Sequence, residues 1–518
     1  MNATQSTTMK STISFLSRTS NPKPATSSVT LLGRLFTLLI ATMLVVTGCK
    51  KENEITPDST IMAAAGHDQA VQVGQLVTLD GSASTESQGK PLTYQWNLIR
   101  KPAKSTVTLG SATTAKPTFT PDEIGEYEVE LTVSSGTSRS TDKVLVTASI
   151  AEPLAITQNI TVKTVLNDRV ANPELPDYIV TKSIALTSEL TINPGVVIAF
   201  ERDTRLDIND GAVIFAKGEP TKKIRFTGVQ NTKGYWVGIM VYSGSNANVF
   251  ENIEVLNAGS RTIISNIKAA MATFGGGKAQ IAVKNSLFAN NDGYGLYIQE
   301  GSILREFAAN TFKTNSDAGI LLDAINVEKL DAASSFTGGN GRNVVEVSSS
   351  AVKKSQKDEI VWAGFTDKTP YRLNGDLSVE TGWKLNPGVT VEVGRDAAIR
   401  INGDAYLSAK GTATEKITIT GASRTPGYWR GLICYSTSPQ NVIEYAEVSN
   451  AGSNAIVSGK KTNIAVYGAK ATMSIKNTKI SGSTGHGIYV GYNCILNTDA
   501  ATVNTFEANG AANIMIDK

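Results

Sequence analysis

The chain repeats itself at a fixed distance of 193 residues. The sequence Asn193-Pro194-Gly195-Val196 recurs at 386–389, and Gly234-Tyr235-Trp236 recurs at 427–429. A longer match, Glu254-Val255 followed by Asn257-Ala258-Gly259-Ser260, recurs from Glu447. One register kept through separate turn sequences indicates an internal duplication and a stacked repeat fold. We expect residues shared by both copies to be framework, and a catalytic site to occur in one copy only.

Composition favours strands over helices and excludes several classes of protein. The 518 residues are rich in Gly (45), Val, Ile, Thr, Ser and Asn, which suit strands and turns. A net charge of +3 argues against a nucleic-acid partner. The two histidines and three cysteines have no zinc-binding spacing, so we expect no metal and no cofactor.

The N-terminus has the features of an export signal. A charged start precedes an apolar stretch from Leu35 to Val46, which is too short to span a bilayer comfortably. Val46-Thr47-Gly48-Cys49 resembles the lipobox of bacterial lipoproteins. The resemblance implies that residues 1–48 are removed, that Cys49 is lipidated, and that residues 49–60 form a polar tether. The alternative is an ordinary signal peptide with an incidental cysteine.

The residues after Cys49 predict where the protein is displayed. Lys50-Lys51-Glu52 resembles the surface-export signals of Bacteroidetes lipoproteins. We therefore expect an outer-membrane lipoprotein that is exposed on the cell surface and held to the membrane by its lipid.

Residues 61–150 predict an immunoglobulin-like β-sandwich. Apolar side chains alternate along 92–97 and 125–133, and turn sequences separate short strands. The stretches 77–84, Tyr94-Gln95-Trp96 and 125–133 resemble the polycystic-kidney-disease (PKD) type domain. That resemblance implies an extracellular spacer or binding module rather than a catalyst.

Residues 151–518 show short strands at steady intervals, punctuated by Gly, Asn and Asp. The step from Asn285 to Asn310 is one coil of 25 residues. Stacked coils of about three strands would bury an apolar column and stack asparagines at the turns. The region resembles the right-handed parallel β-helix of pectin-degrading enzymes and Bacteroidetes lipoproteins, with copies at about 178–323 and 371–518. A β-propeller is the alternative, although its blades are longer than this spacing.

Candidate catalytic residues do not form a convincing set. Gly485-His486-Gly487 and Asn497-Thr498-Asp499 resemble polygalacturonase motifs, but their order is reversed and the usual aspartate pair is missing. The carboxylates Glu251 and Glu254 recur at 444 and 447, which suits salt bridges better than catalysis. We therefore assign no catalytic residue, and whether the chain is an enzyme stays open.

Two repeated aromatic pairs are the candidate glycan-binding residues: Tyr235 with Trp236, and Tyr428 with Trp429. Neighbours on a strand point to opposite faces, so one of each pair would be exposed to stack on a sugar ring. The alternative is that these aromatics fill the coil interior. Cys434 and Cys494 would either form a disulfide or remain thiols.

The predicted fold is all-β: a PKD-type sandwich followed by a duplicated right-handed parallel β-helix. The predicted function is lipid-anchored, non-catalytic binding or adhesion to a glycan or another surface polymer. The alternatives are a β-helix polysaccharide lyase or glycoside hydrolase, and a purely structural rod on the cell surface.

Overall fold

The computed structural model describes residues 59–274, 276, 278–354 and 358–518. The predicted signal peptide, Cys49 and most of the predicted tether lie outside these residues. Among the described residues, no helix is long and apolar enough to cross a membrane.

The sandwich packs a four-stranded sheet against short strand pairs. The sheet has the order β2-β8-β7-β5, and the pairs are β1 with β4 and β3 with β6. Trp96 and Tyr127 are buried in its core, and the indole of Trp96 donates to the Thr114 carbonyl at 3.0 Å. The strands are β1 (Ile61–Met62), β2 (Gln69–Gln72), β3 (Val77–Thr78), β4 (Thr85–Glu86), β5 (Thr93–Arg100), β6 (Thr118–Phe119), β7 (Gly125–Ser135) and β8 (Ser138–Ser149).

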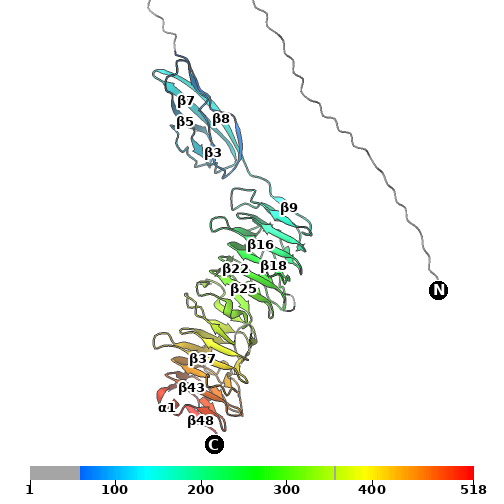
Figure 1. Cartoon of the computed structure of the whole chain (residues 1–518), viewed down its shortest axis with the longest axis vertical. Coiled ribbons are helices and arrows are strands. Elements are labelled where there is room, and N and C mark those ends of the chain that lie inside the picture. The colour runs from blue at the N-terminus through cyan, green and yellow to red at the C-terminus, as the bar shows by residue number, and fades with distance from the viewer. Residues whose placement is uncertain (1–58, 275, 277, 355–357) are drawn as a thin grey trace, which may run out of the picture. The chain divides into compact units, whose positions relative to one another are not determined.

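The described residues that follow the sandwich form a parallel β-helix, as predicted (Figure 1). Each strand pairs in parallel with strands of the coils before and after it, so the strands form long sheets. We name these sheets A to E.

Two sheets belong to the first half. Sheet A contains β9 (Leu154–Ile156), β11 (Tyr178–Val180), β14 (Val197–Phe200), β17 (Ile224–Gly228), β20 (Ile253–Leu256), β23 (Leu287–Ala289), β26 (Thr311–Lys313) and β28 (Ser335–Gly338). Sheet B contains β10 (Thr164–Leu166), β13 (Glu189–Ile192), β16 (Val213–Lys217), β19 (Val249–Glu251), β22 (Gln280–Lys284) and β25 (Ile303–Ala308).

Sheet C runs through both halves. Its thirteen strands are β12 (Ile184–Leu186), β15 (Arg205–Ile208), β18 (Gly238–Val241), β21 (Ala269–Thr273), β24 (Tyr294–Ile298), β27 (Ala318–Leu322), β29 (Arg342–Val347), β32 (Tyr371–Leu373), β35 (Thr390–Val393), β38 (Ile417–Gly421), β41 (Ala446–Ser449), β44 (Lys479–Ser481) and β47 (Thr505–Glu507).

Two further sheets belong to the second half. Sheet D contains β30 (Ser350–Val352), β33 (Leu377–Val379), β36 (Ala398–Ile401), β39 (Gly431–Cys434), β42 (Thr462–Val466), β45 (His486–Val490) and β48 (Ile514–Ile516). Sheet E contains β31 (Glu359–Trp362), β34 (Gly382–Leu385), β37 (Tyr406–Lys410), β40 (Val442–Glu444), β43 (Thr472–Lys476) and β46 (Ile495–Leu496). The described helices are η1 (Asn326–Lys329), a 3₁₀ helix, and α1 (Ala500–Val503).

Inward side chains build one apolar column, and asparagines stack at a turn as expected. The amide of Asn291 donates to Asn315 at 2.9 Å, and that of Asn315 donates to Asn340 at 2.9 Å. All three asparagines are buried, so these side chains satisfy one another and the turn backbone.

The two copies have matching strands but lie one sheet apart. Adding 193 to the bounds of β14, β15 and β16 gives β35, β36 and β37. The first three strands belong to sheets A, C and B, whereas their counterparts belong to sheets C, D and E. In the first copy the second strand of the three, β15, lies in sheet C, whereas in the second copy the first strand, β35, lies there. Equivalent residues of the two copies therefore face different directions.

A buried ionic cluster lies on the outer face of sheet C where the copies meet. The carboxylate of Glu346 accepts hydrogen bonds from Arg342, from the Tyr294 hydroxyl (2.6 Å) and from the Asn374 amide (2.7 Å). Arg342 also pairs with Asp317 at 3.0 Å. Burial raises the pKa of Glu346, but these hydrogen bonds outweigh burial and hold it below its ordinary value.

Candidate functional site

The two predicted tryptophans do not reach the surface. Trp236 and Trp429 are wholly buried, and each indole donates to a backbone carbonyl at 2.8 Å, that of Leu256 or of Ser449. Neither tryptophan is therefore the exposed member of its pair, and both fill the coil interior, which is the alternative that the sequence left open. They lie at a corner just before a strand, where side chains do not alternate as they do within a strand.

The two tyrosines of these pairs are covered by arginines. The guanidinium of Arg202 lies 4.6 Å from the ring centre of Tyr235, which is 4% exposed. Arg395 lies 4.7 Å from the ring centre of the half-buried Tyr428. An arginine already occupies a face of each ring, so these tyrosines are corner residues rather than open platforms.

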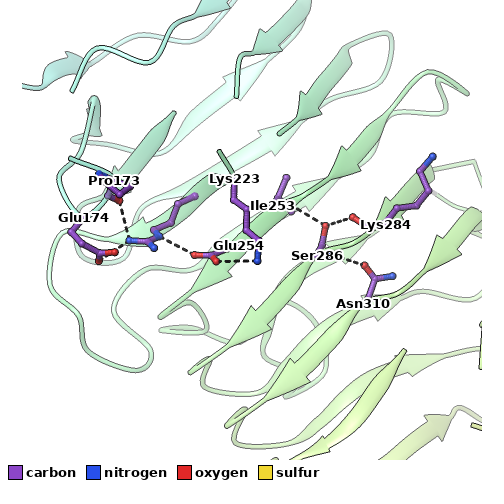
Figure 2. A network of polar contacts seen from close by, with 9 residues as sticks. Pro173, Glu174, Lys223, Ile253, Glu254, Lys284, Ser286 and Asn310 are labelled. Atoms are coloured by element: carbon purple, nitrogen blue, oxygen red, sulfur yellow. Dashed lines mark hydrogen bonds and ion pairs between the residues drawn. The ribbon is translucent and has the colours of Figure 1, made fainter. Parts of the chain in front are cut away.

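In the first copy, the duplicated carboxylates Glu251 and Glu254 are engaged in ion pairs, as the sequence suggested. Glu254 contacts Arg225 at 3.0 Å and Lys223 at 3.5 Å, and Arg225 also pairs with Glu174 at 2.8 Å (Figure 2). In a nearby turn, the buried Ser286 hydroxyl donates to the Lys284 carbonyl at 2.6 Å and accepts from the Ile253 amide of the preceding coil at 3.3 Å. This network ties neighbouring coils together.

The polygalacturonase-like residues do not converge. His486 begins β45 with a buried Nδ1 that has no partner among the described residues. Asn497 instead bonds to Asp499 at 2.6 Å and to the backbone of Ile475. Within the described part of the chain, no group of three or more His, Cys, Asp or Glu residues could hold a metal ion.

A different aromatic set lies on the outer face of sheet C. Ladder one consists of Tyr242, Phe274 and Tyr297, from successive coils. The ring centres of Tyr242 and Phe274 are 5.4 Å apart, and those of Phe274 and Tyr297 are 6.2 Å apart. Met240 packs with them in an apolar cluster outside the main core.

The second copy repeats this arrangement on sheet D. Ladder two consists of Tyr435, Tyr467 and Tyr489. Successive ring centres are 6.5 and 6.2 Å apart. Tyr435 and Tyr467 stand 193 residues after Tyr242 and Phe274, so the ladders are duplicated features.

A short hairpin packs on each ladder. Flap one, residues 260–268, contributes Ile263, Ile264 and Ile267 to the apolar cluster of ladder one. Flap two, residues 453–461, contributes Ile456 and Val457 to the cluster of ladder two. Isolated bridges close the hairpins, between Ile264 and Ile267 in one and between Val457 and Lys460 in the other.

Each flap is tied to the corner by an aspartate. Asp203 pairs with Arg261 of flap one at 2.9 Å, and Asp396 accepts a hydrogen bond from Asn454 of flap two at 3.1 Å. The recurring Arg-Asp sequence thus has a structural role in both copies: its arginine covers the corner tyrosine, and its aspartate holds the flap.

The ladders offer both ring surface and hydrogen-bonding groups. Tyr242, Tyr297, Tyr435 and Tyr467 are half-buried, and their hydroxyls have no partner within the described ranges. Burial, with nearby carboxylates, raises the pKa of Tyr242 and of Tyr297, so both hydroxyls stay protonated and can donate at neutral pH. Apolar ring edges beside free hydroxyls suit a ligand with alternating apolar and polar surfaces, such as a sugar.

The sequence carries a signal for these residues. Tyr242-Ser243 and Tyr435-Ser436 are a repeated pair, and each tyrosine follows a strand in an outward-facing position. Phe274 and Tyr467 are an aromatic match at the same offset. The remaining partners come from other coils, and only the strand register brings them together.

The cysteines Cys434 and Cys494 are not disulfide-bonded. Cys434 is buried at the position of Val241, and burial raises the pKa of its thiol to about 11. Its sulfur donates to backbone carbonyls, so it fills an aliphatic position in the core.

Comparison with known proteins identifies the first domain. A family model that describes a PKD domain matches residues 65–148. The solution structure of the PKD domain from KIAA 1837 protein is 29% identical, covers 17% of this chain and 83% of its own, and has a TM-score of 0.15.

One further solved structure is similar over a short part of the chain. It is a nucleoside hydrolase-related hypothetical protein from Saccharophagus degradans, described as associated with carbohydrate metabolism. It is 19% identical with a TM-score of 0.16, and the match covers 18% of this chain and 25% of that protein. No curated protein matches the chain. Together with the sandwich formed by β1–β8, the family match identifies residues 65–148 as a PKD domain.

Proposed function

We propose that this chain is a lipid-anchored protein of the bacterial cell surface that binds a polysaccharide without transforming it. The lipobox-like sequence ending at Cys49 supports the anchor. The PKD domain is consistent with an extracellular spacer or adhesion module. The two aromatic ladders supply the binding surface.

One observation carries the binding proposal: an outward aromatic ladder under a hairpin flap occurs twice. Four half-buried rings, those of Tyr242, Tyr297, Tyr435 and Tyr467, offer their edges to a chain of sugars, and each contact adds a modest increment. The buried rings of Phe274 and Tyr489 support them from within the ladders. Free hydroxyls beside the rings add hydrogen bonds that fix orientation.

The test is retention of the mature chain on a panel of immobilised neutral and acidic polysaccharides. The double variant Tyr242→Ala with Tyr435→Ala should bind about tenfold or more weakly, because each ring contributes about 0.5–1.5 kcal/mol beyond its buried area. Tyr492→Ala is the matched control, since this tyrosine is 66% exposed and belongs to neither ladder.

Two results would overturn the proposal. Equal binding by the double variant and the wild type would show that the ladders are not the site. Release of unsaturated or reducing sugar ends during the assay would point to a lyase or hydrolase instead.

A further inference from the structure

The two ladders occupy equivalent positions in their copies but differ in charge at the base, by which we mean the strand one coil before each ladder, β15 or β36. In the first copy the strand register runs from Asp207 through Met240 and Ala272 to Tyr297. In the second copy the corresponding register runs from Arg400 to Tyr489. Asp207 and Arg400 are 193 residues apart, so the duplication placed opposite charges at the same site.

A second arginine reinforces the difference at ladder two. Arg430 stands where ladder one has Val237, which packs in the apolar cluster of that ladder. The Nε of Arg430 is buried and has no hydrogen-bond partner among the described residues. A buried donor without an acceptor costs free energy, and a bound anion would supply the acceptor.

The nearby carboxylate does not neutralise both arginines. Asp376 pairs with Arg400 at 2.7 Å and accepts the Ala398 amide at 2.8 Å. The charge of Arg430 also acts on this carboxylate. Two guanidinium groups therefore face one aspartate, which leaves one positive charge at the base of ladder two.

Ladder one has the opposite character. Asp207 pairs with Arg205 at 3.0 Å, yet its Oδ1 is buried and has no partner within the described ranges. The Asp207 carboxylate would repel a ligand anion at the base of ladder one. At the other end both ladders have carboxylates: Glu300 and Asp323 act on Tyr297, and Asp517 accepts a hydrogen bond from Tyr489. The two ladders therefore differ in charge at the base only.

We propose that ladder two binds an anionic polysaccharide, one with carboxylate or sulfate groups, through Arg430 and Arg400, while ladder one binds neutral sugar. This inference rests on the proposed function, because it assigns ligand chemistry to the same ladders. A planar guanidinium matches both kinds of oxyanion, and the adjacent rings hold the sugar.

The experiment compares dextran, carboxymethyl-dextran and dextran sulfate, which share one backbone, by binding of the full mature chain. Arg430→Val should weaken binding of at least one charged dextran about tenfold or more, because it removes a charge-assisted hydrogen bond, and should leave dextran binding unchanged. Valine fills the equivalent position of the first copy, so the fold should accept it. Lys163→Ala is the control for a lost positive charge away from both ladders, since Lys163 is 70% exposed and pairs only with Glu189 among the described residues.

The outcomes separate the inference from the function on which it rests. Weaker binding of carboxymethyl-dextran, dextran sulfate or both by Arg430→Val supports the anion site. The polymer whose binding falls shows whether the site prefers carboxylate or sulfate. Equal weakening of binding by Lys163→Ala, or no weakening by Arg430→Val, overturns the anion site while leaving polysaccharide binding intact. If the wild type binds none of the three polymers, both the anion site and its underlying function fail.

Discussion

Replacing Glu346 with glutamine should destabilise the β-helix where its two copies meet. The Glu346 side chain is 3% exposed and accepts from three donors, those of Arg342, Tyr294 and Asn374. Glutamine has only one acceptor oxygen, so at least one of the three donors loses its hydrogen-bond partner. The remaining donors then bond to a neutral amide oxygen instead of a charged carboxylate. We expect a loss of about 2–4 kcal/mol in the free energy of unfolding. Arg342 keeps its ion pair with Asp317 and is 36% exposed, so the loss of stability is smaller than for a buried charge left without any partner.

The assay is urea unfolding followed by tryptophan fluorescence, since Trp362 and Trp383 lie in adjoining coils of sheet E. Glu306→Gln is the matched control. Glu306 is 54% exposed and pairs with Lys284 at 3.1 Å, so its loss should cost less than about 1 kcal/mol. Equal destabilisation by the two variants would refute the reasoning.

The Glu346 effect should also depend on pH. The folded pKa of Glu346 lies below the unfolded value of about 4.3, so its stabilisation is fully present above that value. It is lost as the pH falls through the lower folded pKa, because the protonated carboxyl no longer holds Arg342. The difference between wild type and Glu346→Gln should therefore shrink in acid. A difference that grows in acid would contradict this account.

Three further predictions follow from the other features. Trp236→Ala and Trp429→Ala should each destabilise the fold by about 3–5 kcal/mol in urea unfolding, because both are buried, but should not weaken polysaccharide binding by the folded protein. Weaker polysaccharide binding by either folded variant would show instead that its indole contacts the ligand. Cys49→Ala should abolish incorporation of labelled fatty acid and move the protein out of the membrane fraction; continued membrane association would refute the lipid anchor. Asp396→Ala should speed hydrogen exchange in flap two but not in flap one, since it removes the bond to Asn454, and equal exchange would show that this bond does not hold the flap.

The fold could be read from the sequence because its evidence is local and repeated. Alternating apolar residues in 125–133 predict the long strand β7, and the 25-residue step from Asn285 predicts stacked coils. The site could not be read in the same way. Tyr242, Phe274 and Tyr297 come from three coils, and their contact depends on strand register rather than on sequence spacing.

The inward position of Trp236 and Trp429 has a physical cause. Alternation of side chains holds along a strand, but Trp236 comes before β18 (Gly238–Val241), at a corner where the backbone turns. The corner directs the indole inward, where it stacks on Phe200 with ring centres 4.1 Å apart. A repeated motif identified framework residues correctly, but it did not identify which framework residues were exposed.

The one-sheet offset between the copies determines how a long ligand meets this protein. A straight polymer that leaves ladder one along sheet C passes Leu321 and then meets the ionic residues Glu346 and Arg372, not ladder two. Ladder two begins seven strand spacings after the start of ladder one, about 34 Å, and on another sheet. With both ladders occupied, one molecule would therefore hold two separate chains on different faces of the β-helix. Many such molecules would act as cross-links in a gel and would stiffen the polymer network around the cell.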